Sequence, residues 1–115
     1  MPAKAIEVTP SQEKKMSDPE PGLRRQVMSY STNIMLVRHT MKKGWVGTRH
    51  SHPQEQMVYI VRGHLAFQHP GGAFEAVAGD SFLVPGNVKH QASALEDSEV
   101  LDVFTPYRED YADPR

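Results

Sequence analysis

Two histidines separated by a single residue, His50 and His52, are the clearest chemical feature of the sequence. They lie in a predicted strand, where alternate side chains point to the same face, so both imidazoles are available to one metal ion. His90 follows a Pro-Gly-Asn turn, beyond which a strand can bring it to the same cavity, and Gln56 begins the next apolar run. An H-x-H pair alone is equally typical of a structural or surface pair. His39 shares the parity of its apolar neighbours and is expected to be a packed or half-exposed strand residue.

The absence of cysteine restricts the chemistry that this chain can perform. The 115 residues include six histidines and no cysteine, which excludes disulfides, thiolate metal ligands and cysteine nucleophiles. A metal must therefore be held by imidazole, carboxylate or amide groups, and neutral imidazoles suit Zn, Ni, Fe, Mn or Cu. The composition favours a divalent transition metal without identifying it.

A second unusual feature is Asp102, which lies in the middle of an apolar run on the face that it shares with Val100 and Phe104. An unpaired buried carboxylate is costly, so Asp102 must be paired, adjacent to a metal or in a wet cavity. Pro106 then ends the run, and Arg108 follows on a segment that can fold back. One hypothesis is a purely structural ion pair between Asp102 and Arg108.

The elements that must position these side chains are short strands. Runs rich in β-branched and aromatic residues alternate with Gly, Pro or Asn punctuation every 8 to 15 residues, and no long helical period appears. This pattern predicts an all-β fold, a sandwich or small barrel of antiparallel strands. The predicted strands are residues 25–30, 33–41, 46–52, 56–62, 64–69, 73–77, 81–84, 90–94 and 99–105.

Length and charge limit the class of protein. One domain is expected, with the barrel over residues 23–115 and a polar, proline-rich N-terminal arm over residues 1–22, either disordered or packed on a partner subunit. Thirteen Lys and Arg against fourteen Asp and Glu give a net charge of −1, which argues against nucleic-acid binding. No segment approaches the roughly 18 apolar residues of a membrane span. We therefore expect a cytoplasmic protein with no membrane partner.

Two sequence motifs with fixed spacing surround these candidate residues. Together they resemble the two motifs of the cupin superfamily. The first motif is carried by Gly44, His50, His52, Gln56 and Gly63, and the second by Gly79, Pro85, Asn87 and His90. The chain departs from the family pattern in three places, with Gln56 for Glu, Asn87 for Gly and Ala94 for a final Asn. The resemblance implies a jelly-roll β-barrel that binds one divalent metal, such as Ni, Mn, Zn or Fe. It also implies that the metal ligands are His50, His52, Gln56 and His90.

The segment from Asp102 to Arg108, Asp-x-Phe-x-Pro-x-Arg, resembles the small cupins of pectin and alginate catabolism, which convert 4,5-unsaturated uronates to linear ketouronates. This resemblance implies that Asp102, Phe104 and Arg108 take part in catalysis on a small sugar acid. Asp102 would move protons, Phe104 would pack on a face of the sugar, and Arg108 would hold the carboxylate. Small cupins commonly pair through an edge strand and an N-terminal arm, so a homodimer is expected, with residues 25–41 as candidate exposed strands.

Other functions remain open at this point. Related three-histidine cupins are metal-dependent dioxygenases, and a polyketide cyclase can share this ligand set. Gln56 counts modestly against oxygenation, because a glutamate there would supply a charge for a higher oxidation state. The same cavity can also bind a small ligand without turnover, so enzymatic activity is a hypothesis. Oxygen uptake would indicate the dioxygenase, and ligand-dependent stabilisation without product would indicate the binding module.

Overall fold

The computed structural model describes residues 5–11 and 16–112. These residues form short strands and one terminal helical turn, as the punctuation of the sequence predicts. The strands are β1 (Met16–Glu20), β2 (Leu23–Tyr30), β3 (Met35–Met41), β4 (Glu55–Arg62), β5 (His64–His69), β6 (Gly72–Val77), β7 (Ser81–Val84), β8 (Gln91–Ala94) and β9 (Ser98–Thr105), and the helix is α1 (Glu109–Ala112). Within the described residues, no helix combines the length and apolar character of a membrane span.

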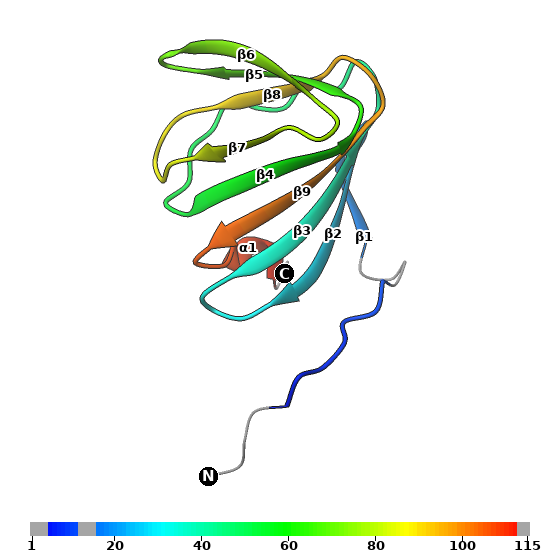
Figure 1. Ribbon diagram of the computed structural model, residues 1–115, viewed down its shortest axis with the longest axis vertical. Coiled ribbons are helices and arrows are strands. Elements are labelled where there is room, and N and C mark those ends of the chain that lie inside the picture. The colour runs from blue at the N-terminus through cyan, green and yellow to red at the C-terminus, as the bar shows by residue number, and fades with distance from the viewer. Residues whose placement is uncertain (1–4, 12–15, 113–115) are drawn as a thin grey trace.

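Two antiparallel sheets face each other across the core (Figure 1). The larger sheet has the order β1-β2-β3-β9-β4-β7, and the smaller one has the order β6-β5-β8. Strand β9 joins the larger sheet together, because it pairs with β3 on one side and β4 on the other. The all-β jelly-roll prediction is therefore confirmed.

Strict alternation along β9 decides which of its side chains enter the interior. Ser98, Val100, Asp102 and Phe104 are buried, whereas the residues between them are partly exposed. The pleat of a strand sends every second side chain to the same face, so Asp102 is carried inward with its apolar neighbours. In the register of the sheet, Asp102 lies opposite Val37 of β3 and Val58 of β4.

The buried apolar side chains form two clusters. The larger one joins β4, β5 and β9 through side chains such as Ile60, Leu65 and Val100, and the smaller one consists of Met35, Val37 and Phe104. Tyr107 and Tyr111, from the segment that follows β9, pack against the smaller cluster. This packing holds the C-terminal helical turn α1 against the smaller cluster.

The predicted strand over residues 46–52 is wrong. Its β-pairing consists of two isolated bridges, Val46 to Ser93 of β8 and His50 to His90, the residue before β8. Gly47 lies tight against its surroundings, since a Cβ there would meet the Trp45 ring at 2.8 Å and the Ala92 carbonyl oxygen at 3.2 Å. The segment therefore runs extended beside β8 without forming a regular ladder.

Strand β1 lies inside the predicted arm. It pairs with β2 of the same chain and forms an edge of the larger sheet. Residues 5–11 run extended away from the sheets (Figure 1), and Ile6 and Val8 are almost fully exposed there. Residues 1–4 and 12–15 of the predicted arm lie outside the described part of the chain. The candidate exposed strands at 25–41 instead have neighbours on both sides, because β2 lies between β1 and β3, and β3 lies between β2 and β9.

Candidate metal centre

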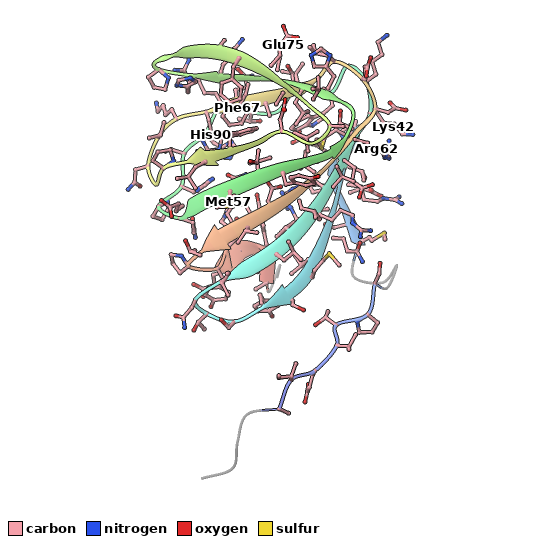
Figure 2. The ribbon with its side chains drawn as sticks, viewed as in Figure 1. Lys42, Met57, Arg62, Phe67, Glu75 and His90 are labelled. Carbon is pink, nitrogen blue, oxygen red and sulfur yellow. The ribbon has the colours of Figure 1, made fainter. Side chains whose placement is uncertain are left out.

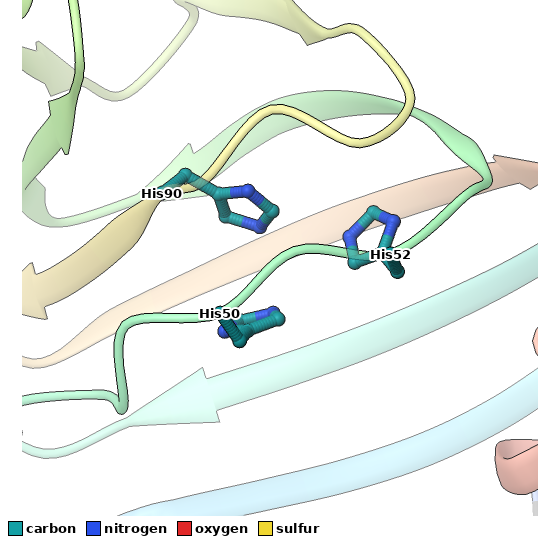
Figure 3. Close-up of side chains that lie close together, drawn as sticks. All are labelled: His50, His52 and His90. Carbon is teal, nitrogen blue, oxygen red and sulfur yellow. The ribbon is translucent and has the colours of Figure 1, made fainter.

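Three histidine side chains converge between the sheets (Figure 3). One nitrogen from each of His50, His52 and His90 lies within 4.8 Å of the corresponding nitrogens of the other two. The ring centroids of His50 and His90 are 4.5 Å apart, and those of His52 and His90 are 5.0 Å apart. Such a group of imidazoles can coordinate a transition-metal ion.

Each of the three rings is oriented by a hydrogen bond to a nearby backbone carbonyl. The Nδ1 atom of His50 lies 2.8 Å from the Thr48 oxygen, that of His90 lies 2.8 Å from the Val88 oxygen, and that of His52 lies 3.0 Å from the Gln54 oxygen. A carbonyl oxygen only accepts, so in each ring Nδ1 carries the proton and donates it. The Nε2 atom of each neutral ring is therefore a bare lone pair, the form that binds a metal.

Burial keeps two of these rings neutral. Desolvation lowers the pKa of His52 and of His90 below the ordinary histidine value of 6.5, and the positive charge of Arg108 lowers both further. A histidine whose pKa falls below 6.5 is predominantly neutral at pH 7. Both rings are thus ready to act as ligands without first losing a proton.

Local backbone contacts bring the three histidines together. His50 and His90 exchange two backbone hydrogen bonds, of 3.0 Å and 2.9 Å, across their bridge. Asn87, with a positive φ of 67°, donates its backbone N–H to the His52 carbonyl at 2.7 Å. Asparagine tolerates this left-handed conformation better than most residues, which explains how it replaces glycine here. Gly86 approaches Pro53 so closely that a Cβ would lie 2.4 Å from its carbonyl oxygen.

An aromatic ring supports His90 from the smaller sheet. Phe67 of β5 stacks on His90 with a centroid distance of 5.5 Å and an interplanar angle of 13°. Figure 2 labels both residues. Phe104 of β9 meets His52 edge-on, at 5.6 Å and 75°. These contacts fix the ring planes of His90 and His52. The Nδ1 atoms of the same two rings are already held by hydrogen bonds to backbone carbonyls.

Gln56 connects this histidine group to Asp102. Its Oε1 atom lies 3.0 Å from Nε2 of His52, and its amide nitrogen donates to Oδ1 of Asp102 at 2.8 Å. Asp102 is 3% exposed. The structure thus brings His50, His52, Gln56, His90 and Asp102 into one region of the interior.

The hypothesis of a structural ion pair between Asp102 and Arg108 is wrong, because the carboxylate contacts His39 instead. Oδ2 of Asp102 lies 2.6 Å from Nδ1 of His39, on the neighbouring strand β3. Arg108 instead forms a bidentate pair with Asp110, two residues away, at 3.1 Å and 2.9 Å. The parity of His39 with the inward-facing apolar residues of β3 was the signal that placed it inside, but the register that brings it to Asp102 is not visible in the sequence.

Arg108 lies beside this site, and one nitrogen of its guanidinium has no hydrogen-bond partner among the described residues. Its side chain is 12% exposed, and its Nη1 atom is buried without a hydrogen-bond partner in the described residues. Its guanidinium lies 4.1 Å from the centre of the Tyr111 ring and 5.4 Å from that of Phe104. Burial raises the pKa of Tyr111, so this phenol stays neutral.

A cavity of about 510 Å³ joins these groups. Its size falls within the range of small-molecule sites. Its polar lining includes His50, Gln56, His90, Asp102 and Arg108, and Phe104 is among the apolar residues that also line it. His50, Gln56 and His90 of the two sequence motifs therefore share a space large enough for a small ligand with Asp102 and Arg108.

Two facing antiparallel sheets that hold three histidines in their interior are the architecture of the cupins. The cupin-domain family model matches residues 37–104, and the chain belongs to this family. It is 30% identical over 92 residues to the pectin degradation protein KdgF of Dickeya dadantii (strain 3937), a match that covers 78% of this chain and 84% of that protein.

Solved structures agree with this assignment. The structure of KdgF from Halomonas sp. is 34% identical, with a TM-score of 0.83 over 90% of this chain and 98% of that one. An RmlC-like cupin from Shewanella frigidimarina NCIMB 400 is 31% identical, with a TM-score of 0.85 over 93% of this chain and 96% of that one. Both matches extend beyond the family model to most of the described chain.

Proposed function

We propose that this chain is a metal-dependent enzyme that opens a small 4,5-unsaturated uronate to a linear ketouronate. The observation that carries the proposal is the position of Asp102, a buried carboxylate that lines the same cavity as His50 and His90 and is linked to His52 through Gln56. The similarity to two KdgF proteins, one of them named for pectin degradation, supports the choice of substrate.

We assign Gln56 as the fourth metal ligand, beside His50, His52 and His90. The 3.0 Å contact between Oε1 of Gln56 and Nε2 of His52 cannot be a hydrogen bond of a neutral ring, because the one ring proton of His52 is donated to Gln54. Two donor atoms that would each bind one divalent metal at about 2.0–2.2 Å come within about 3–3.5 Å of each other. The pair of electron-rich atoms therefore fits a shared divalent cation.

The conversion is an isomerisation, so it needs no oxidant or co-reactant. The bond between C1 and the ring oxygen breaks, the C1 hydroxyl loses a proton to leave an aldehyde, and C4 gains a proton as C5 becomes a ketone. A bound divalent metal would supply Lewis-acid polarisation of a substrate oxygen. Asp102, whose two oxygens accept hydrogen bonds, would take up the hydroxyl proton and return a proton to C4.

Arg108 and Phe104 would position the substrate for these proton transfers. The unpartnered Nη1 of Arg108 is a donor available to the uronate carboxylate, and binding there would satisfy a buried polar atom. Phe104 lines the same cavity and would pack against a face of the sugar. The substrate would then span the space between Arg108 and the histidines, with Asp102 beside it.

The test follows the ultraviolet absorbance of the conjugated double bond in purified unsaturated uronates. We expect the absorbance to fall faster with the protein than without it, and the metal-depleted protein to lose this acceleration until a divalent metal is restored. No acceleration over several unsaturated uronates would contradict the proposal. Oxygen consumption during turnover would support a dioxygenase instead, and ligand-dependent stabilisation with no product would support a binding module.

We also propose that the chain forms a homodimer. Ile6 and Val8 in the extended N-terminal segment are 102% and 88% exposed, so the described residues of their own chain do not cover them. The outer side of the larger sheet adds Met57 and Tyr59 of β4, which are about half exposed. A second copy of the chain would bury these apolar groups. Sedimentation at micromolar concentration should show a dimer, and a monomer would contradict the expectation.

A further inference from the structure

A continuous hydrogen-bonded chain leads from Arg25 of β2 to the proposed metal ligands. Nε of Arg25 donates to Nε2 of His39 at 3.0 Å, and Nδ1 of His39 lies 2.6 Å from Oδ2 of Asp102. Oδ1 of Asp102 accepts from the Gln56 amide at 2.8 Å, and the amide oxygen faces His52. Three neighbouring strand pairs of one sheet, β2 with β3, β3 with β9 and β9 with β4, place these side chains in line.

Arg25 sets the direction of this chain. A guanidinium has only donors and keeps its proton in proteins, so Nε2 of His39 must accept. The proton of a neutral His39 is then on Nδ1 and points at Asp102. Both oxygens of Asp102 thus accept hydrogen bonds, one from His39 and one from Gln56, and the oxygen of Gln56 is left to face the histidines.

The two residues at the start of the chain are themselves firmly placed. The guanidinium of Arg25 lies 3.7 Å from the centre of the Tyr111 ring, and the ring of His39 meets Tyr111 edge-on at 6.1 Å. The side chain of His39 is 12% exposed. Tyr111 therefore holds both residues against the inner face of the larger sheet, which limits other rotamers of either one.

We propose that Arg25 and His39 are positioning residues for the proton-transfer group of this site. Arg25 fixes the tautomer of His39, and His39 holds the Asp102 carboxylate in the orientation that also points the Gln56 oxygen toward the metal position. Neither residue needs to touch the substrate for this role. The catalytic consequence rests on the proposed uronate-opening function, whereas the orientation of the His39 ring does not.

The catalytic test compares His39→Leu with His39→Asn. Leucine removes the donor, whereas the amide nitrogen of asparagine can occupy the place of Nδ1 and donate to Asp102. Loss of a residue that orients a metal-site group typically costs about 10- to 100-fold in activity. We expect His39→Leu to lower kcat by this amount with little change in KM, and His39→Asn to recover most of the loss.

A matched control comes from a second histidine–carboxylate pair among the described residues. Nε2 of His64 lies 2.6 Å from Glu75 on the smaller sheet, and neither residue lines the cavity. His64→Leu should leave kcat unchanged. An unchanged kcat in His39→Leu, or equal losses in folded, metal-loaded His39→Leu and His39→Asn, would overturn the positioning role.

A measurement on the ring itself needs no substrate. Nitrogen-15 NMR of the zinc-loaded protein should show His39 protonated at Nδ1 and unprotonated at Nε2, and Arg25→Met should shift it toward the other tautomer. A wild-type His39 protonated at Nε2 would overturn the inference, even if a variant failed to fold. If the wild type opened no unsaturated uronate but His39 showed the expected tautomer, the proposed function would fail while the assigned orientation stood.

Discussion

Replacing Asp102 by asparagine should lower kcat for uronate opening by about a hundredfold to ten-thousandfold, the range typical of losing a general acid–base group. Asparagine has nearly the same shape but cannot carry the transferred proton. It also replaces one of two accepting oxygens by a donor, which would face the N–H of either His39 or Gln56. Initial rates from the fall in ultraviolet absorbance, at saturating substrate, measure the change.

A second carboxylate on the same strand gives the control for this variant. Glu99 of β9 faces away from the interior, where it pairs with Arg38 at 3.5 Å and Arg62 at 3.4 Å. Glu99→Gln makes the same chemical change outside the cavity and should leave kcat close to the wild-type value, because Glu99 does not line the cavity. If Asp102→Asn behaved like Glu99→Gln, Asp102 would have no part in proton transfer.

Replacing His90 by alanine should remove most of the metal-dependent stabilisation. A metal that binds only the folded chain adds about 2.7 kcal/mol to the free energy of unfolding when its free concentration is a hundred times Kd. His90 is 4% exposed and supplies one of three converging nitrogens, so its loss removes most of this gain. The measurement is thermal unfolding of metal-depleted protein with and without added Ni²⁺ or Zn²⁺, together with the bound metal per chain.

His69→Ala is the matched variant, because His69 lies at the end of β5 outside the histidine group. It should keep the metal-dependent rise in Tm, although its Tm without metal can differ from that of the wild type. The comparison within each variant, with and without metal, separates ligation from packing. Equal metal content and equal stabilisation in His90→Ala and the wild type would remove His90 from the proposed ligand set.

The sequence was sufficient to predict the class of fold, because turn residues and alternation are local features. It was not sufficient for β1, whose residues Met16–Glu20 are mostly polar and include Pro19. Proline is tolerated on an edge strand, where an N–H is not needed on the open side, so composition alone could not distinguish this strand from a loop. Residues 46–52 show the converse, a predicted strand that stays extended without a full ladder.

The candidate site was predictable to the extent that its residues belong to spaced motifs. The convergence of His50, His52 and His90 agrees with the motif spacing, although His50 and His52 do not lie on a regular strand. The contact of Asp102 with His39 was not predictable, because it joins residues 63 apart through the register of β3 and β9. Arg108 pairs locally with Asp110 instead, since a carboxylate two residues away competes effectively for a bidentate guanidinium.

The central place of β9 in the larger sheet has a consequence for biosynthesis. The ribosome makes this strand after the other strands that the structure describes, yet it joins the β1-β2-β3 group to the β4-β7 pair. A nascent chain that has not yet released residues 98–105 holds two unjoined half-sheets with open inner edges, which are prone to aberrant pairing. Asp102 and Phe104 belong to β9, so the step that closes the larger sheet also completes the pocket. A polypeptide terminated before residue 98 would have neither a closed sheet nor a complete pocket.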